Sequence, residues 1–401
     1  MVLRFEAVKH SRKEMVMKKI LSIFLALMLV CSFSVNIFAE PAVTNQNFDE
    51  SVFKNIGKDE VKKFILKNES AAYNVNGIKF TDSRIVYTPD QISFKTSAEV
   101  SEVLKAKDVE DLPYIKGILK CLEANSFENI SEEQKADIVS KKLETNYENS
   151  APIIIDQIVK VVDQKISDVQ SYIGTASTID MDFLISIDPK DANNISQNTV
   201  KISGLDCFDN EMNVNEFKLR TDDEIFESGI KDCEDYISNY QKGTNMNYAS
   251  LVPINNYDSY SRLNARDYAF RWWGPKDSDY NPAYSNYNGR GGDCANFVSQ
   301  CLFAGGIPTS RYWYTDSPYW LGAGNLKQYM VDNGYATNAA YTSTNAGNFA
   351  YTSANNGHIV LVTLNDTEHI CYTAHNNNRY NQPFSNDMLS TYSFYVIKNN
   401  P

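Results

Sequence analysis

Residues 291–302 of the 401-residue chain have the sequence GGDCANFVSQCL, and a second glycine pair follows at 305–306. Asp293 is a good helix N-cap residue, and the glycines before it permit a sharp turn into a helix. The apolar residues after it repeat at intervals of three and four, and the second glycine pair is typical of a helix end. The stretch therefore predicts a helix of about three turns that begins at Cys294.

The Cys294 thiol is the candidate nucleophile. The free N–H groups and the positive dipole end of a helix N-terminus favour thiolate over thiol, so we expect its pKa to be lowered. The backbone N–H of Cys294 is the natural oxyanion donor, with Asp293 supporting it as the helix cap. The alternative is a buried thiol, because Cys294 shares a helical face with Phe297 and with Cys301, which we interpret as a core residue.

A thiolate nucleophile needs a base, and the chain has four candidates: His10, His358, His369 and His375. Two apolar strands flank a turn at 365–368, and a symmetric turn would place His358 opposite His375, on the same face. We therefore predict His358 as the base, His375 as the group that orients it, and His369 as a bystander near the turn. A slip of one residue would bring in Asn376 instead. The alternative is that both strand-end histidines lie in solvent.

Charge divides the chain into two parts. The net charge is −15 over residues 40–254 and −1 over 255–401, although the whole chain has −12. All four Trp and 17 of 25 Tyr lie in the second part. We predict a separate acidic mixed α/β domain at 40–245 and a second domain at 255–401. The surplus of carboxylates excludes nucleic-acid binding, which depends on Lys and Arg.

Periodicity in the acidic part predicts helices at Lys58–Asn68, Ser131–Tyr147 and Asp222–Tyr240, and strands at Ile78–Tyr87, Ile179–Ile187 and Thr199–Ser203. No metal spacing, phosphate loop or nucleophile signature is present there. We interpret Cys121, Cys207 and Cys233 as core residues, with a Cys207–Cys233 disulfide as the alternative.

The first 39 residues have the pattern of a secretory signal peptide. Lys18 and Lys19 precede an apolar run over 20–38, and the small residue Ala39 offers a cleavage site. A membrane anchor is the alternative, but polar residues crowd the second half of the run. We therefore expect a secreted or cell-wall-associated protein that meets the membrane only transiently.

Aromatic residues near the predicted site have two interpretations. Tyr268 lies on the buried stripe of a helix predicted at 259–273, and Trp313 and Trp320 lie in an aromatic loop. They could line a groove for a sugar or peptide, or they could anchor the core.

The order of a helix-start Cys, a strand-start His and a polar group on the next strand resembles the papain-like fold of NlpC/P60 and CHAP cysteine hydrolases. Residues 257–398 resemble the family called "putative amidase domain", through GGDCANFVSQCL, HIVLVT at 358–363 and Ala-His-Asn at 374–376. The pair at 347–348 is Gly-Asn, where that family usually has Gly-Asp. The resemblance implies an α+β domain whose Cys helix packs on an antiparallel sheet, with Cys294, His358 and His375 as its catalytic residues.

These observations predict an exported, cysteine-dependent amide hydrolase that forms an acyl-enzyme and acts on cell-wall peptide or related amide bonds. No cofactor and no metal is expected. The alternative is a catalytically inactive module that binds cell-wall or surface ligands on the same fold.

Overall fold

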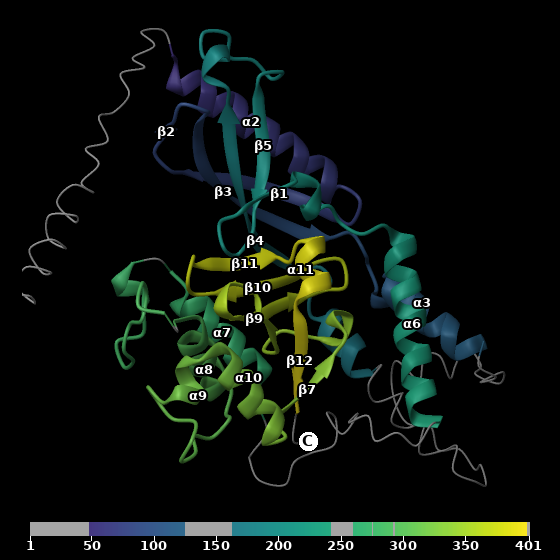
Figure 1. Ribbon diagram of the computed structural model, residues 1–401. Helices are drawn as coiled ribbons and strands as arrows, with labels where there is room; N and C mark the ends of the chain where they lie inside the picture. Colours follow the sequence, from purple (N-terminus) through teal and green to yellow (C-terminus); the bar gives the residue numbers. More distant parts are fainter. Residues whose placement is uncertain (1–47, 125–162, 242–259, 275, 292, 399–401) are drawn as a thin grey trace, which may run out of the picture.

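The computed structural model describes residues 48–124, 163–241, 260–274, 276–291 and 293–398. The predicted signal peptide and the helix predicted at 131–147 lie outside these residues. Within them, no helix is long and apolar enough to cross a membrane. Figure 1 shows two sheets, with helices packed against each.

The first sheet is built from β1 (Tyr73–Asp82), β2 (Val86–Tyr87), β3 (Ile92–Leu104), β4 (Ala176–Ile187), β5 (Val200–Leu205) and β6 (Glu211–Met212). Its order is β1-β3-β4-β5-β6, with β2 beside β3, and every pairing is antiparallel. The acidic region is therefore α+β rather than mixed α/β. The strand predicted at 78–87 is divided between β1 and β2, and the long β3 was not predicted at all.

The helices that accompany this sheet include α2 (Glu50–Glu69), α3 (Pro113–Ala124) and α6 (Asp222–Gln241), and residues 163–170 are also helical. They confirm the helices predicted at 58–68 and 222–240. The α2 helix begins after its N-cap Asp49 and buries Phe53 and Val61 against the sheet. Helices α3 and α6 approach so closely that a Cβ at Gly117 would lie 2.1 Å from the Phe226 carbonyl oxygen.

The cysteines of this region are buried thiols, as predicted. The Cys207 Sγ lies 2.9 Å from the Tyr392 hydroxyl. Cys233 instead neighbours Cys121, whose side chain is its hydrogen-bond partner. A Cys207–Cys233 disulfide is therefore absent from the structure.

The second sheet has the order β11-β10-β9-β8-β12-β7, again with antiparallel pairing. Its strands are β7 (Ala336–Ala339), β8 (Phe349–Thr352), β9 (His358–Asn365), β10 (Ile370–Ala374), β11 (Arg379–Pro383) and β12 (Ser393–Ile397). The helices are α7 (Arg262–Trp272), α8 (Asp293–Ala304), α9 (Pro318–Leu321), α10 (Ala323–Asp332) and α11 (Asn386–Thr391). The Cys helix α8 packs on this antiparallel sheet, which confirms the α+β arrangement.

The two faces of the second sheet have different covers. Helices α7, α8 and α10 cover one face, where Ile359 and Leu361 of β9 join a core with Cys294. On the other face, Val360 and Val362 pack with Cys207 and with residues of α11. Strand β9 therefore separates two cores, and the side on which a residue points decides which core it meets.

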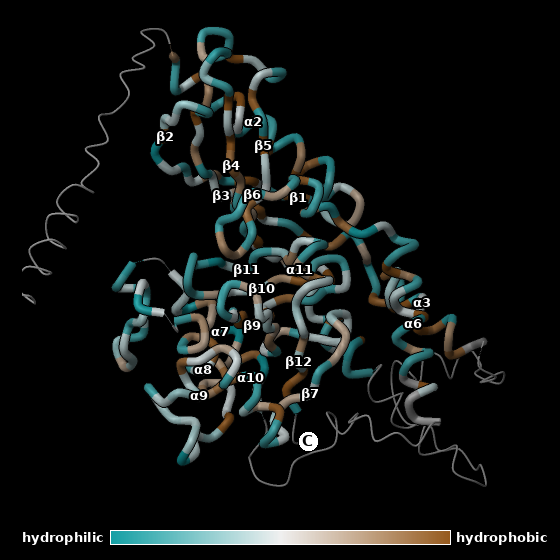
Figure 2. Tube along the Cα trace, viewed as in Figure 1, coloured by the Kyte–Doolittle hydropathy of each residue, from teal (hydrophilic) through white to brown (hydrophobic). Residues whose placement is uncertain are grey.

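The two sheets are packed against each other. Leu364 and Cys371 of the second sheet belong to the core of the first, and strands β4 and β11 are in contact. Asn381 Nδ2 donates to the Thr178 carbonyl at 2.7 Å, and Arg379 is paired with Asp182 at 3.1 Å. In Figure 2 the hydrophobic, brown stretches include parts of β4, β9 and β10. The predicted separate acidic domain is thus in close contact with its neighbour.

Candidate active site

Helix α8 begins at Asp293, one residue earlier than predicted, and places Cys294 in its first turn. Both residues are buried, with 0% and 4% of their surface exposed. The polar residues of the same helix fix the neighbouring loop. Asn296 Oδ1 accepts from the Trp320 indole at 2.9 Å, and Ser299 Oγ accepts from the Trp313 indole at 3.2 Å. Two buried polar side chains of this helix therefore hold two tryptophans in place.

Asp293 faces His375. Its Oδ2 lies 3.1 Å from His375 Nδ1, within ion-pair distance, although the angle is outside that of a regular hydrogen bond. Its Oδ1 accepts from Asn296 Nδ2 and from the backbone N–H of Tyr287, each at 3.3 Å. Burial opposes the charged carboxylate, but His375 and these donors outweigh it and lower the pKa of Asp293.

His375 is held on all sides. Its Nε2 donates to the Trp272 carbonyl at 2.8 Å, which leaves Nδ1 directed at Asp293. The ring stacks on Phe297 at 4.1 Å, one helical turn beyond Cys294, and contacts Tyr280 at 4.4 Å. The carboxylate and the aromatic rings together place an oriented imidazole beside the N-terminus of α8.

The Cys294 sulfur interacts with backbone N–H groups rather than with an imidazole. The N–H groups of Ile359 and Ala295 act on the sulfur and lower its pKa, but burial has the larger effect and the net pKa is raised. The expected lowering of this pKa is therefore wrong, because a helix N-terminus cannot offset a nearly complete loss of solvent. In this conformation the thiol is protonated at neutral pH.

The predicted pairing of His358 with His375 is wrong. Strand β10 pairs Cys371 with Leu364 but Tyr372 with Val362, so one extra residue lies in β9 between these pairs. If this register continues beyond β10, His375 lies opposite Ile359, on the α8 face. The neighbouring His358 consequently points to the other face.

The surroundings of His358 agree with this assignment. Its ring lies 5.2 Å from that of Phe208, in the layer between the two sheets. Burial and, to a smaller extent, the charge of Arg379 lower its pKa to about 4, although Asp206 acts in the opposite direction. A buried, neutral imidazole on the far side of β9 cannot act as the base for Cys294, so the role predicted for His358 is not supported by its position.

The predicted substrate groove is not formed by the tryptophans. Trp313 and Trp320 are completely buried and are core anchors, which was the alternative interpretation. Tyr268 is half-buried, and its hydroxyl donates to Gln300 Oε1 at 2.7 Å and accepts from Asn281. Asn376, the alternative third member, follows β10 with a φ of 61°, in the turn that leads to β11.

Comparison with known families agrees with the resemblance noted in the sequence. Residues 259–397 match the family described as "putative amidase domain". This part of the chain, about a third of its length, is similar to that family and is called the amidase domain below. The matched residues include α7, α8, the whole second sheet, and therefore Cys294, Asp293 and His375.

One relative extends this comparison. The "Uncharacterized protein YhbB" of Bacillus subtilis (strain 168) is 37% identical over 84 residues, which cover 18% of this chain and 25% of that protein. The match thus spans about a quarter of the relative. No solved structure matches the chain, so the papain-like character of the amidase domain stays a prediction.

The structure adds one relationship that the sequence did not reveal. Asp293 was predicted only as a helix cap, yet its carboxylate also pairs with the imidazole of His375, 82 residues away in the chain. The sequence did place Asp293 directly before the candidate nucleophile, and that position was the available signal. Its pairing with the distant His375 depends on the register of β9 and β10, which the sequence did not reveal.

Proposed function

We propose that this protein is an exported cysteine-dependent amide hydrolase whose site consists of Cys294, His375 and Asp293. The observation that supports it best is the Asp293–His375 pair beside a thiol in the first turn of a buried helix, within an amidase domain. Cysteine hydrolases use this set of groups: a sulfur nucleophile, an imidazole for proton transfer and a third group that orients the imidazole.

The proposed reaction has two halves. His375 removes the proton from Cys294, and the sulfur attacks the amide carbonyl carbon, so that a C–S bond forms. The C–N bond then breaks, and His375 gives its proton to the departing amine. Water hydrolyses the thioester, with His375 again accepting a proton, and returns the free thiol. Asp293 stabilises the imidazolium in both halves, and the backbone N–H of Cys294 remains our candidate oxyanion donor.

The resting conformation requires a local change before this chemistry. The thiol is 4% exposed, and His375 Nε2 is occupied by the Trp272 carbonyl. Among the described residues, neither imidazole is hydrogen-bonded to the sulfur. We propose that substrate binding opens the first turn of α8 and turns His375 toward Cys294, since catalytic hydrogen bonds often tighten only in the substrate complex.

The substrate class is a separate part of the proposal. The pattern of residues 1–39 predicts export, and an exported hydrolase of amides meets the peptide bonds of the cell wall. We therefore propose stem-peptide amides of peptidoglycan as the substrate.

The test is hydrolysis of purified wall fragments by the full chain, followed by detection of newly formed amino groups. We expect release by the wild type, none by Cys294→Ser, and wild-type release by Cys301→Ser, a matched thiol on the same helix. Equal release by the wild type and Cys294→Ser would contradict the proposal.

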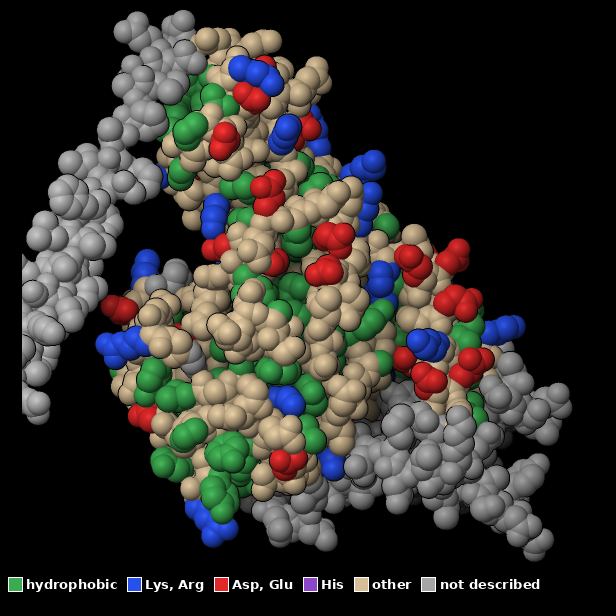
Figure 3. Space-filling model, viewed as in Figure 1, with side chains coloured by type: hydrophobic (Ala, Val, Ile, Leu, Met, Phe, Trp, Pro, Cys, Tyr) green, Lys and Arg blue, Asp and Glu red, His purple; other side chains and the backbone are tan. Residues whose placement is uncertain are grey.

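The raised pKa of Cys294 favours a second candidate function, an inactive relative that binds cell-wall or surface ligands. Under this alternative, Cys294→Ala binds wall fragments as the wild type does, and neither releases amino groups. Tyr312 and Tyr314 are each 51% exposed and would supply aromatic contacts for such binding. Figure 3 shows hydrophobic side chains gathered near α9, and acidic ones spread over the N-terminal sheet and α6.

A further inference from the structure

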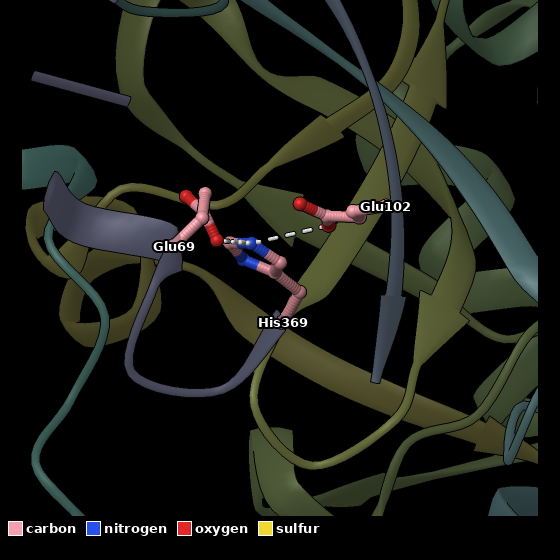
Figure 4. Close-up of side chains that lie close together, drawn as sticks. All are labelled: Glu69, Glu102 and His369. Carbon is pink, nitrogen blue, oxygen red and sulfur yellow. Dashed lines mark hydrogen bonds and ion pairs between the residues drawn. The ribbon is translucent and has the colours of Figure 1, made fainter. Parts of the chain in front are cut away.

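Two glutamates and a histidine meet in the layer between the two sheets. Glu69 is the last residue of α2, Glu102 lies in β3, and His369 lies in the turn between β9 and β10. All three are buried, with exposed fractions of 0%, 0% and 4%. Figure 4 shows the three side chains pointing toward one another from these separate elements.

The distances bring three good metal ligands together. His369 Nε2 lies 2.8 Å from Glu69 Oε2 and 3.6 Å from Glu102 Oε1. One ligand atom from each residue lies within 4.8 Å of the other two. A tetrahedral Zn²⁺ with bonds of about 2.0–2.1 Å separates its ligand atoms by roughly 3.3 Å, so small movements of the side chains would admit an ion.

Glu102 has unsatisfied hydrogen-bonding capacity within this cluster. Neither of its carboxylate oxygens has a hydrogen-bond partner, although the side chain is completely buried. Isolated buried carboxylates of this kind are costly unless they bind a proton or a metal ion.

We propose that Glu69, Glu102 and His369 bind one Zn²⁺ ion that joins the N-terminal sheet to the amidase domain. Carboxylate oxygen and imidazole nitrogen are ordinary zinc ligands, and a water molecule would complete four-coordination. Binding at Nε2 releases the proton that now joins His369 to Glu69, so zinc binding releases protons to the solvent.

The surrounding contacts fit such a site. The backbone N–H of His369 donates to Asp366 Oδ1 at 2.9 Å, and the Tyr73 hydroxyl donates to the same carboxylate. The Tyr73 ring stacks on His369 at 5.0 Å, and Asn68 Nδ2 donates to Glu69 Oε1 at 2.9 Å. Partners of this kind orient the ligands of metal sites.

This proposal differs from two expectations from the sequence: that the chain needs no metal, and that His369 is a bystander. His369 does lie near the turn, but the turn is buried against the first sheet. Its glutamate partners lie about 270 and 300 residues earlier in the chain, so the sequence has no short ligand spacing that would predict the site.

The test is zinc content and thermal stability of the full chain, purified with a tag that does not bind metal. After removal of metal with a chelator, ZnCl₂ is titrated and Tm is measured at each step. We expect about one zinc per chain by mass spectrometry and a rise in Tm of about 4–8 °C that saturates at one equivalent. CaCl₂ should give no rise, because Ca²⁺ needs six or more oxygen ligands.

Matched variants show where the zinc binds. Glu102→Gln keeps the shape of the side chain, and we expect it to lose the zinc and the rise in Tm. Asp180→Asn changes another poorly solvated carboxylate, on the opposite face of the first sheet, and should respond as the wild type does. Less than about 0.1 zinc per chain, or an equal rise in Tm in Glu102→Gln, would overturn the proposal. Loss of the proposed hydrolase activity would leave these readings unchanged.

Discussion

The described residues include two buried acid–imidazole clusters that differ in the number of carboxylates around the imidazole. In the amidase domain, His375 has one carboxylate partner, Asp293, and Cys294 directly follows Asp293 in the chain. Between the two sheets, His369 lies near two carboxylates, Glu69 and Glu102, and Glu102 has no hydrogen-bond partner. The first pair can orient an imidazole for proton transfer, whereas the second cluster offers three ligand atoms to one metal ion.

The largest expected effect is the loss of hydrolysis when the Cys294 thiol is removed. Cys294→Ser should lower hydrolysis of wall fragments by at least about 1,000-fold, because the step that forms the acyl-enzyme is lost. The measurement is the initial rate of amino-group release. Glu102→Gln, in the other cluster, should change this rate by less than about threefold per folded molecule. A large loss in Glu102→Gln instead would place the chemistry between the sheets.

The next prediction concerns His375 and His358, which lie on opposite faces of the second sheet. His375→Gln should lower the rate by about 100- to 10,000-fold, the usual contribution of acid–base catalysis. His358→Gln should leave the rate within about threefold, since that ring faces Phe208 on the other side of the sheet. Both rates are to be normalised to the folded fraction from circular dichroism. The reverse pattern would restore the assignment made from sequence.

Removal of the Asp293 carboxylate should destabilise the fold. The pKa of Asp293 is lower in the native state than in the unfolded chain. The pair therefore stabilises the fold above the unfolded pKa of about 3.9, and this stabilisation is lost as pH falls through the native pKa. We expect Asp293→Asn to lower the free energy of unfolding by about 3 kcal/mol at pH 7, with a smaller loss near pH 3.

Urea unfolding between pH 3 and pH 7 measures this effect. The control is Asp267→Asn, which removes the exposed ion pair with Arg266 on α7 and should cost less than about 0.5 kcal/mol. A loss for Asp293→Asn that does not change with pH would show that the carboxylate acts only through packing.

The smallest prediction concerns the resting thiol. Because burial raises the pKa of Cys294, iodoacetamide should label it at pH 7 at least about tenfold more slowly than a free cysteine. Labelling should accelerate only above pH 9, as followed by mass spectrometry of the Cys294 peptide. Rapid labelling below neutrality would mean that the thiolate is already formed without substrate.

The sequence predicted the parts of the site that depend on local pattern. Helix α8, its acidic start and the apolar strands β9 and β10 follow from spacing and capping alone. The register between these strands does not. The extra residue in β9 is Thr363, whose hydroxyl donates to Asn381 Oδ1 and accepts from Thr373, so a third strand helps to fix the bulge. This one-residue shift places His358 and His375 on opposite faces of the sheet, whereas the sequence predicted the same face.

The partners of His369 were beyond sequence pattern for a related reason. Glu69 continues the buried stripe of α2 after Val61 and Ile65, and Glu102 lies on the buried face of β3 between Val100 and Leu104, so each is a polar residue at an apolar position. That pattern marks each residue separately but does not show that they meet His369. Only the packing of the second sheet on the first buries them together. Side chains that meet across an interface between distant segments have no regular spacing in the sequence from which their contact could be predicted.

The most direct test of the central claim is mass spectrometry of the full chain after brief incubation with wall fragments and rapid acid quenching. The account predicts an acyl adduct on the peptide that contains Cys294, absent from Cys294→Ser and longer-lived in His375→Gln. An unmodified Cys294 in a wild-type sample that is releasing amino groups, or an adduct on another residue, would contradict it.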